Sequence, residues 1–228
     1  MQKERECKYK TSTNYNYLIN KEAIDMTGKT HMAVGVGIAT LLLPANDAKT
    51  IIGGTTLALI GSLIVDIDTD KSKGAVLLKE AFGGAVILMI LGVILKAKFN
   101  INVLNYISEN KTITQMFPAL AILVVVLTIG KFSSHRGFTH SLIGIVAYAV
   151  PVYMLVGSLY TWFLIGYIAH ILADMLNKKE VRLLYPLKNG VCLKICSANG
   201  VVDKILFISF IAITVLKYIS ALNIIHNT

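Results

Sequence analysis

Histidine and aspartate residues of this chain stand at the edges of long apolar segments, where they could do chemistry. His135 and His140 frame the stretch HRGFTH, which comes directly before an apolar segment. His170 and Asp174 belong to the stretch HILAD, and a helix would place them on one face because they are four positions apart. Such side chains could bind a metal or make a polar contact between helices.

Other ionisable residues have a similar setting. Asp66 and Asp68 follow the apolar run LIGSLIV, where a carboxylate is costly without a partner. His31 opens the first apolar segment. Asp70 lies further into a lysine-rich stretch, and we interpret it as an ordinary solvated acid.

Imidazole and carboxylate groups are the usual mixed ligands of Zn²⁺ and similar divalent metals. If successive segments alternate in direction, these residues all fall at one end of a bundle. A closed structural zinc site takes four ligands, so this set suits two or three metals, or one metal with groups that orient its ligands. The candidate metal ligands are His31, Asp66, Asp68, His135, His140, His170 and Asp174.

A cluster of this kind predicts a pocket that holds a divalent metal, preferably zinc, as cofactor. Two metals about 3.5–4 Å apart can activate a water and stabilise both oxygens of a phosphoryl transfer. The candidate catalytic residues are Asp68 and Arg136, whose guanidinium group matches phosphate oxygens bidentately.

Each of these motifs also has a structural explanation that involves no metal. His170 and Asp174 could be a hydrogen-bonded pair between helices, and His31 could simply lie at a membrane interface. In HRGFTH, Gly137 offers a turn and Thr139 a helix N-cap, so this stretch could be a helix entry whose basic residues face lipid phosphates.

Composition indicates what must position these residues. Hydrophobic residues make up 55% of the 228 residues and charged residues only 15%, whereas soluble domains have about 25% charged residues. We therefore expect an all-α, polytopic membrane helix bundle. The net charge of +9 comes from cations in short loops, and without a groove-reading motif we expect no nucleic-acid partner.

Seven apolar segments are predicted, the first two of which could form a short hairpin joined by the Pro44–Lys49 turn. Residues 1–25 are a polar, basic extension, either a disordered tail or the product of an upstream start, and residues 26–228 form the membrane domain. The segments are 31–44, 51–65, 81–97, 113–131, 138–157, 159–176 and 204–225.

Charge also predicts orientation. With alternating segments, 17 of the 22 lysine and arginine residues fall on the side that carries the histidine and aspartate cluster. The positive-inside rule places that side in the cytoplasm. Residues 177–203, on the same side, are predicted to form an ordered re-entrant or interfacial loop. We interpret Cys192 and Cys196 in this loop as structural or interfacial thiols, because three cysteines form no disulfide framework.

Several short motifs, in order along the chain, resemble the YdjM-like inner-membrane proteins. They are MTGKTH at 26–31, DID at 66–68, HRGFTHS at 135–141, HILAD at 170–174 and RLLYPL at 182–187. This family is described as membrane-bound metal-dependent hydrolases, some linked to LexA-regulated DNA-damage responses. It is grouped with the all-helical zinc-dependent phospholipase C and nuclease superfamily.

The resemblance implies phosphoester hydrolysis at His/Asp-bound metals in a membrane protein. A pocket at the cytoplasmic headgroup level would suit a membrane lipid or a lipid-linked phosphate, such as a polyprenyl phosphate, as substrate. Two other classes remain open. A metal or ion transporter should hold its ligands near the bilayer midplane, and a non-catalytic adaptor would use the cluster only to hold its helices together.

Overall fold

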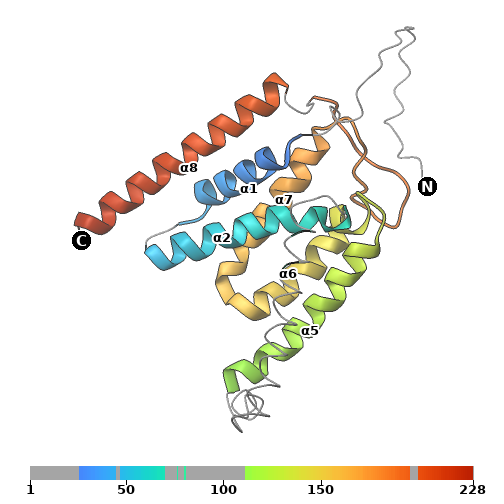
Figure 1. Cartoon of the computed structure of the whole chain (residues 1–228), viewed down its shortest axis with the longest axis horizontal. Helices are drawn as coiled ribbons and strands as arrows, with labels where there is room; N and C mark the ends of the chain where they lie inside the picture. The colour runs from blue at the N-terminus through green and yellow to red at the C-terminus, as the bar shows by residue number, and fades with distance from the viewer. Residues whose placement is uncertain are drawn as a thin grey trace.

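The structure is a computed structural model that describes residues 26–44, 47–69, 111–195 and 200–227, together with Val76 and Glu80. All the regular elements in these residues are helices, which confirms the predicted all-α class. The α-helices are α1 (Gly28–Leu42), α2 (Ala48–Ile64), α5 (Lys111–Phe132), α6 (Leu142–Val156), α7 (Tyr160–Met175) and α8 (Val201–Asn227), and the short 3₁₀ helices are η1 (Val65–Asp68), η2 (Phe138–His140) and η3 (Gly157–Leu159) (Figure 1).

The first two helices form the predicted hairpin. Thr27 caps the start of α1, where its side chain accepts a hydrogen bond from the backbone N–H of Thr30. Pro44 follows the end of α1 and lacks the N–H that a continuing helix needs. Asp47 then caps α2 by accepting the N–H of Thr50 at 2.9 Å.

Helix α7 lies against α1, α2 and α6, and its contact with α2 is the most extensive. A methyl group on Gly166 of α7 would collide with the carbonyl oxygen of Ala58 in α2. The Ser62 hydroxyl, in α2, donates to the carbonyl oxygens of both Ala58 and Gly166, at 2.9 and 3.2 Å. Small residues thus let two apolar helices approach closely, as they do in membrane proteins.

The remaining helices complete the bundle around this pair. Gly157, with φ +58°, ends α6 and turns the chain into α7, so the turn predicted near this residue is confirmed. Helix α5 runs along α6, and α8 packs on α1, with Phe210 seated against Gly37 (Figure 1). The main core lies between α2, α5, α6 and α7 and contains Val65, Val126, Phe138, Tyr148, Phe163 and Tyr167.

Two helical stretches are long and apolar enough to cross a membrane, Thr50–Asp68 and Leu142–Met175; the second includes the turn at Gly157. Met116–Phe132 is a shorter apolar helix. The described residues therefore support membrane spans but not the predicted count of seven apolar segments. The segment at 81–97 and the extension at 1–25 lie outside the described residues, as does Asp70.

An ordered loop follows α7, as predicted. Val181 and Val191 form an antiparallel bridge, with both N–H···O distances at 2.9 Å. The N–H groups of Leu193 and Ile195 then donate to the last carbonyls of α7. Cys192 is disulfide-bonded, which corrects its interpretation as a thiol; its partner cysteine lies outside the described residues.

Candidate metal centre

Four chain segments that are distant in sequence meet at one end of the bundle. They are the start of α1, the end of α2 with η1, the stretch before α6, and the end of α7 (Figure 1). In η1 the buried side chains of Val65 and Ile67 alternate with Asp66 and Asp68. Burial of the two apolar residues therefore fixes both carboxylates, and the convergence expected from the order of the segments is observed.

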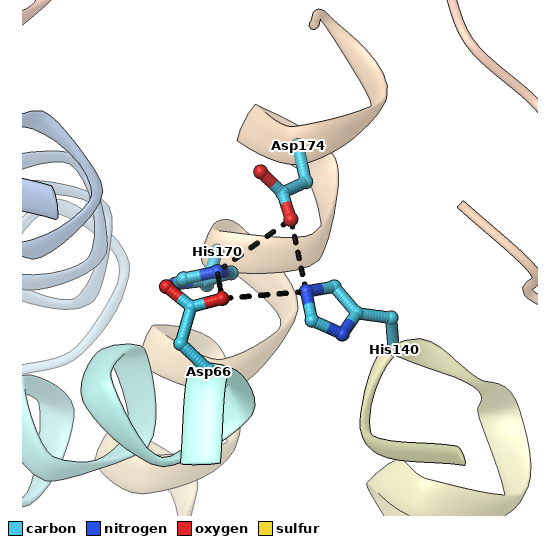
Figure 2. Close-up of side chains that lie close together, drawn as sticks. All are labelled: Asp66, His140, His170 and Asp174. Carbon is cyan, nitrogen blue, oxygen red and sulfur yellow. Dashed lines mark ion pairs between the residues drawn. The ribbon is translucent and has the colours of Figure 1, made fainter. Parts of the chain in front are cut away.

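An inner cluster, defined as Asp66, His140, His170 and Asp174, lies at the centre of this meeting point (Figure 2). His140 Nε2 lies 2.9 Å from Asp174 Oδ2 and 3.7 Å from Asp66 Oδ1. His170 Nε2 lies 3.5 Å from Asp66 Oδ1 and 3.7 Å from Asp174 Oδ2. Asp66 is 30% exposed and the other three side chains are buried, so among the described residues Asp66 is the member of the inner cluster that reaches the surface.

The backbone of α2 orients the His170 ring. His170 Nδ1 lies 2.6 Å from the carbonyl oxygen of Ser62 and must carry the proton, because a carbonyl only accepts. The lone pair of a neutral His170 is therefore on Nε2, which faces the two carboxylates. The close packing of α2 on α7 thus sets the position of the ring and also its tautomer.

A hydrogen-bonded chain orients the His140 ring in the same sense. The Thr139 hydroxyl donates to Asp68 Oδ2 at 3.0 Å, and its oxygen lies 3.0 Å from His140 Nδ1. Because the hydroxyl hydrogen is committed to Asp68, Thr139 accepts the Nδ1 proton. His140 Nε2 therefore also presents a lone pair to the inner cluster.

When both imidazoles are neutral, the resulting inner cluster consists of four acceptors and no donor. Neither His140 Nε2 nor His170 Nε2 has a hydrogen-bond partner among the described residues, even though His140 Nε2 lies close to Asp174. Ligands about 2.1 Å from a tetrahedral zinc are about 3.4 Å apart, and the four distances of 2.9–3.7 Å lie around that value. The donor set and its spacing therefore fit a divalent metal.

Asp174 is held so that one oxygen remains for the inner cluster. Its Oδ1 accepts hydrogen bonds from Arg136 Nη2 and Asn177 Nδ2, both at 2.9 Å. Asn177 in turn accepts the backbone N–H of Met26 at 2.9 Å. Sequence reasoning missed Asn177, although its place three residues after Asp174, just beyond the end of α7, is the signal that could have found it.

Arg136 is buried, and its hydrogen bonds connect several parts of the site. Besides Asp174, its guanidinium group donates to the carbonyl oxygen of Lys179 at 3.0 Å. Its backbone is left-handed, with φ 58°, and its N–H donates to Asp68 Oδ2 at 3.1 Å. These contacts make Arg136 a residue that positions Asp174 and Asp68, and the phosphate contact expected from the sequence stays a prediction.

His31 lies beside the inner cluster rather than within it. Its ring stacks on His170 with the centroids 4.2 Å apart and the planes at 20°. Its Nε2 approaches Asp174 Oδ1 at 3.4 Å, which is the oxygen that Arg136 and Asn177 also hold. His31 is therefore better placed to orient the neighbouring ligands than to share a metal with them.

An outer cluster, defined as Asp66, Asp68 and His135, adjoins the inner one and shares Asp66 with it. Asp68 Oδ1 lies 3.0 Å from His135 Nδ1. The His135 side chain is 29% exposed. Burial lowers the pKa of His135, but the hydrogen bond and negative charge of Asp68 outweigh burial and raise that pKa above its ordinary value of 6.5.

Membrane-length apolar helices and a buried His/Asp centre define the class: a helical integral membrane protein with a candidate metal site at one end of its spans. The chain belongs to the family described as YdjM inner membrane protein, whose model matches residues 26–226. It is 40% identical over 67 residues to the inner membrane protein YdjM of Escherichia coli (strain K12), and to that of Shigella flexneri. This match takes in 25% of the chain and 33% of each relative, so the chain covers about a third of their length. No solved structure matches the chain.

Proposed function

We propose that this protein is a membrane-bound, metal-dependent hydrolase that cleaves a phosphoester of a lipid or polyprenyl headgroup at the cytoplasmic face of the membrane. The observation that carries the proposal is the donor set of the inner cluster. Two buried imidazole nitrogens, both with Nδ1 committed elsewhere, face two carboxylates. Such an arrangement of acceptors is stabilised by a cation, and zinc is the metal that imidazole and carboxylate together favour.

Each cluster would have a distinct role. Asp66, His140, His170 and Asp174 would hold the first metal, and Asp68 and His135 would share Asp66 with a second. A divalent metal bound in such a centre activates water and neutralises charge on a phosphoryl group. Asp66, as the partly exposed member of both clusters, marks the side from which a substrate would enter.

The buried residues around the inner cluster would keep its geometry fixed and exclude water. The hydroxyl of Tyr167 donates to the carbonyl oxygen of Thr139 at 2.5 Å and so fixes the stretch that carries His140. Tyr148 packs against Tyr167 and Phe138 behind this stretch. These contacts would hold the His140 stretch in place while a reacting group approached past the partly exposed Asp66.

The depth of the site supports a headgroup substrate. The spans Thr50–Asp68 and Leu142–Met175 both end at the clusters, so the centre lies at a membrane–water boundary rather than at mid-span. The excess of basic residues on this side supports a cytoplasmic orientation by the positive-inside rule. A phosphate attached to a lipid lies at this level of the bilayer.

The test combines metal content with turnover on the full chain. Protein purified without chelators and reconstituted with zinc should retain at least one metal by elemental analysis. It should also release phosphate or a phosphorylated headgroup from a panel of phospholipids and polyprenyl phosphates. Asp174→Asn should lose both properties. Asp47→Asn should keep both, because Asp47 lies at the far end of α2 and asparagine is an equally good N-cap. Wild-type protein without metal would contradict the proposal.

A second candidate is a metal-binding membrane protein without catalysis, either structural or an adaptor. The inner cluster offers four ligand atoms, one from each of its residues. This number favours the non-catalytic candidate, because structural zinc sites are closed by four protein ligands. A transporter is less favoured, because its ligands should lie at mid-span. Metal that is retained without turnover on any substrate of the panel would select this second candidate.

A further inference from the structure

The loop after α7 exposes both apolar and basic side chains. We define the basic loop as residues 178–195, which contain four lysines and one arginine against a single acid, Glu180. Large apolar side chains in the same loop are 53–60% exposed: Leu184, Leu187, Leu193 and Ile195. Exposed apolar side chains on an ordered loop are typical of a surface that binds a protein or a membrane.

The tip of the basic loop presents these two kinds of side chain together. The N–H of Leu187 donates to the carbonyl oxygen of Leu184 at 2.9 Å and closes a turn. Within this turn the Tyr185 ring packs edge-on against Phe138 of the core, with the centroids 6.4 Å apart. The turn is thus anchored through Tyr185, while Leu184, Leu187 and Lys188 remain exposed.

Hydrogen bonds also fix the position of the basic loop relative to the ends of a candidate membrane span. Leu193 donates its N–H to the carbonyl oxygen of Met175, the last residue of a candidate span, at 2.7 Å. Leu142, the first residue of that stretch, donates its N–H to Leu183 at 2.9 Å. The loop therefore lies where the spans leave the hydrocarbon.

We propose that the basic loop binds the anionic phospholipid surface of the leaflet at which these spans end. Leu184 and Leu187 enter the upper acyl region, while Lys178 and Lys188 lie among the headgroups. Apolar side chains flanked by cations are the combination that binds an anionic membrane surface. An apolar patch alone would also suit a protein partner, but the excess of cations calls for a negatively charged surface.

This surface is joined to the candidate metal centre. Arg136, which holds Asp174, donates to the carbonyl oxygen of Lys179, and the N–H of Arg182 donates to the carbonyl oxygen of Arg136. Anionic headgroups bound by the basic loop would therefore gather close to the residue that holds Asp174. The inference does not require the protein to be a hydrolase, because it concerns only the loop and the lipid.

The test places a fluorescent reporter at the tip. The full chain with Leu187→Trp is reconstituted in nanodiscs of equal parts phosphatidylglycerol and phosphatidylcholine, with brominated acyl chains on one lipid or the other. The signal of the parent chain, whose single Trp162 is buried, is subtracted. We expect quenching that is stronger when the bromine is on phosphatidylglycerol. Adding Lys178→Gln and Lys188→Gln should reduce this preference, by up to about fivefold for each lysine.

A reporter in the span provides the control. Val146→Trp, at a position 62% exposed on α6, should be quenched equally by both brominated lipids. Equal quenching at position 187 would mean insertion without recognition of charge and would overturn the proposal. Quenching by aqueous iodide alone would overturn it as well, and so would protection from both iodide and bromine, which would mean that protein covers the tip.

Discussion

The inner and outer clusters use the same residue types and share Asp66, yet they are built differently. The inner cluster takes its histidines from buried positions whose Nδ1 atoms are committed to Ser62 and Thr139. The outer cluster takes His135 from a partly exposed stretch, and its Nδ1 faces Asp68 directly. In the inner cluster the Nε2 atoms of both imidazoles are available to a metal. In the outer cluster a proton shared by His135 and Asp68 must be lost before these two residues can bind one. If both clusters bind metal, we expect the tighter binding at the inner cluster and the more readily exchanged ion at the outer one.

The largest effect should come from removing an imidazole of the inner cluster. His140→Ala should lower the affinity for zinc by more than about 100-fold, because losing a ligand costs more than losing a group that only orients one. Competition with a chromogenic chelator measures this change. His226→Ala is the matched control, since His226 belongs to the last turn of α8, and that end of α8 lies away from the start of α1 and the end of α7 (Figure 1). Equal affinity in both variants would remove the distinction on which the comparison rests.

The next effect should come from the residues that orient Asp174. Asn177→Ala removes a donor to Asp174 Oδ1 without touching any ligand atom, so zinc affinity should fall about 10–100-fold. Asn189→Ala, at an exposed position of the basic loop, should leave it unchanged. If Asn177→Ala bound zinc like wild type, Asp174 would be positioned by Arg136 alone.

The contact between α2 and α7 should matter for the inner cluster because it sets the position of His170. Gly166→Ala would press a methyl group on the backbone of Ala58, and overpacking of this kind costs about 1–3 kcal/mol. Gly53→Ala is the matched control, since its methyl group would meet only Leu159 at an ordinary 3.7 Å. Denaturant unfolding in detergent should show destabilisation for Gly166→Ala alone. Equal stability of the two variants would mean that the helices can separate without cost.

The smallest effect should appear at the outer cluster of the metal-free protein. Because Asp68 raises the pKa of His135, their ion pair stabilises the fold fully below about pH 6.5, the ordinary pKa of histidine. That contribution is lost as the pH rises through the higher pKa of the folded state. The melting temperature of His135→Gln should therefore fall below that of wild type at pH 6 and approach it at pH 9. A difference that grows with pH would reverse the assigned sign.

Sequence reasoning could predict the convergence of the site because it depends on the order of the segments. Alternating helices place the start of the first segment and the ends of α2 and α7 on one side, whatever their packing. His170 and Asp174 on one helical face followed in the same way from their spacing. Predicting the hairpin of α1 and α2 needed only two short apolar segments joined by the turn at Pro44–Lys49.

The division into two clusters could not be predicted, because it depends on which atoms of a side chain meet. The hydrogen bond from His170 to Ser62 exists only because Gly166 lets α2 approach α7. The burial of Arg136 depends on the basic loop folding back to offer the carbonyl oxygen of Lys179. His31 has a ligand's residue type, and only the stacking on His170 shows that it lies beside the inner cluster.

The most direct test of the central claim is X-ray absorption at the zinc edge of the reconstituted full chain. The inner cluster predicts nitrogen and oxygen ligands about 2.0–2.2 Å from zinc, with two imidazoles and no sulfur in the tightly bound fraction. The same measurement on His140→Ala should show one imidazole fewer in any zinc that remains. A protein that retains no zinc, or a spectrum with sulfur ligands, would contradict the claim, as would an unchanged imidazole count in His140→Ala.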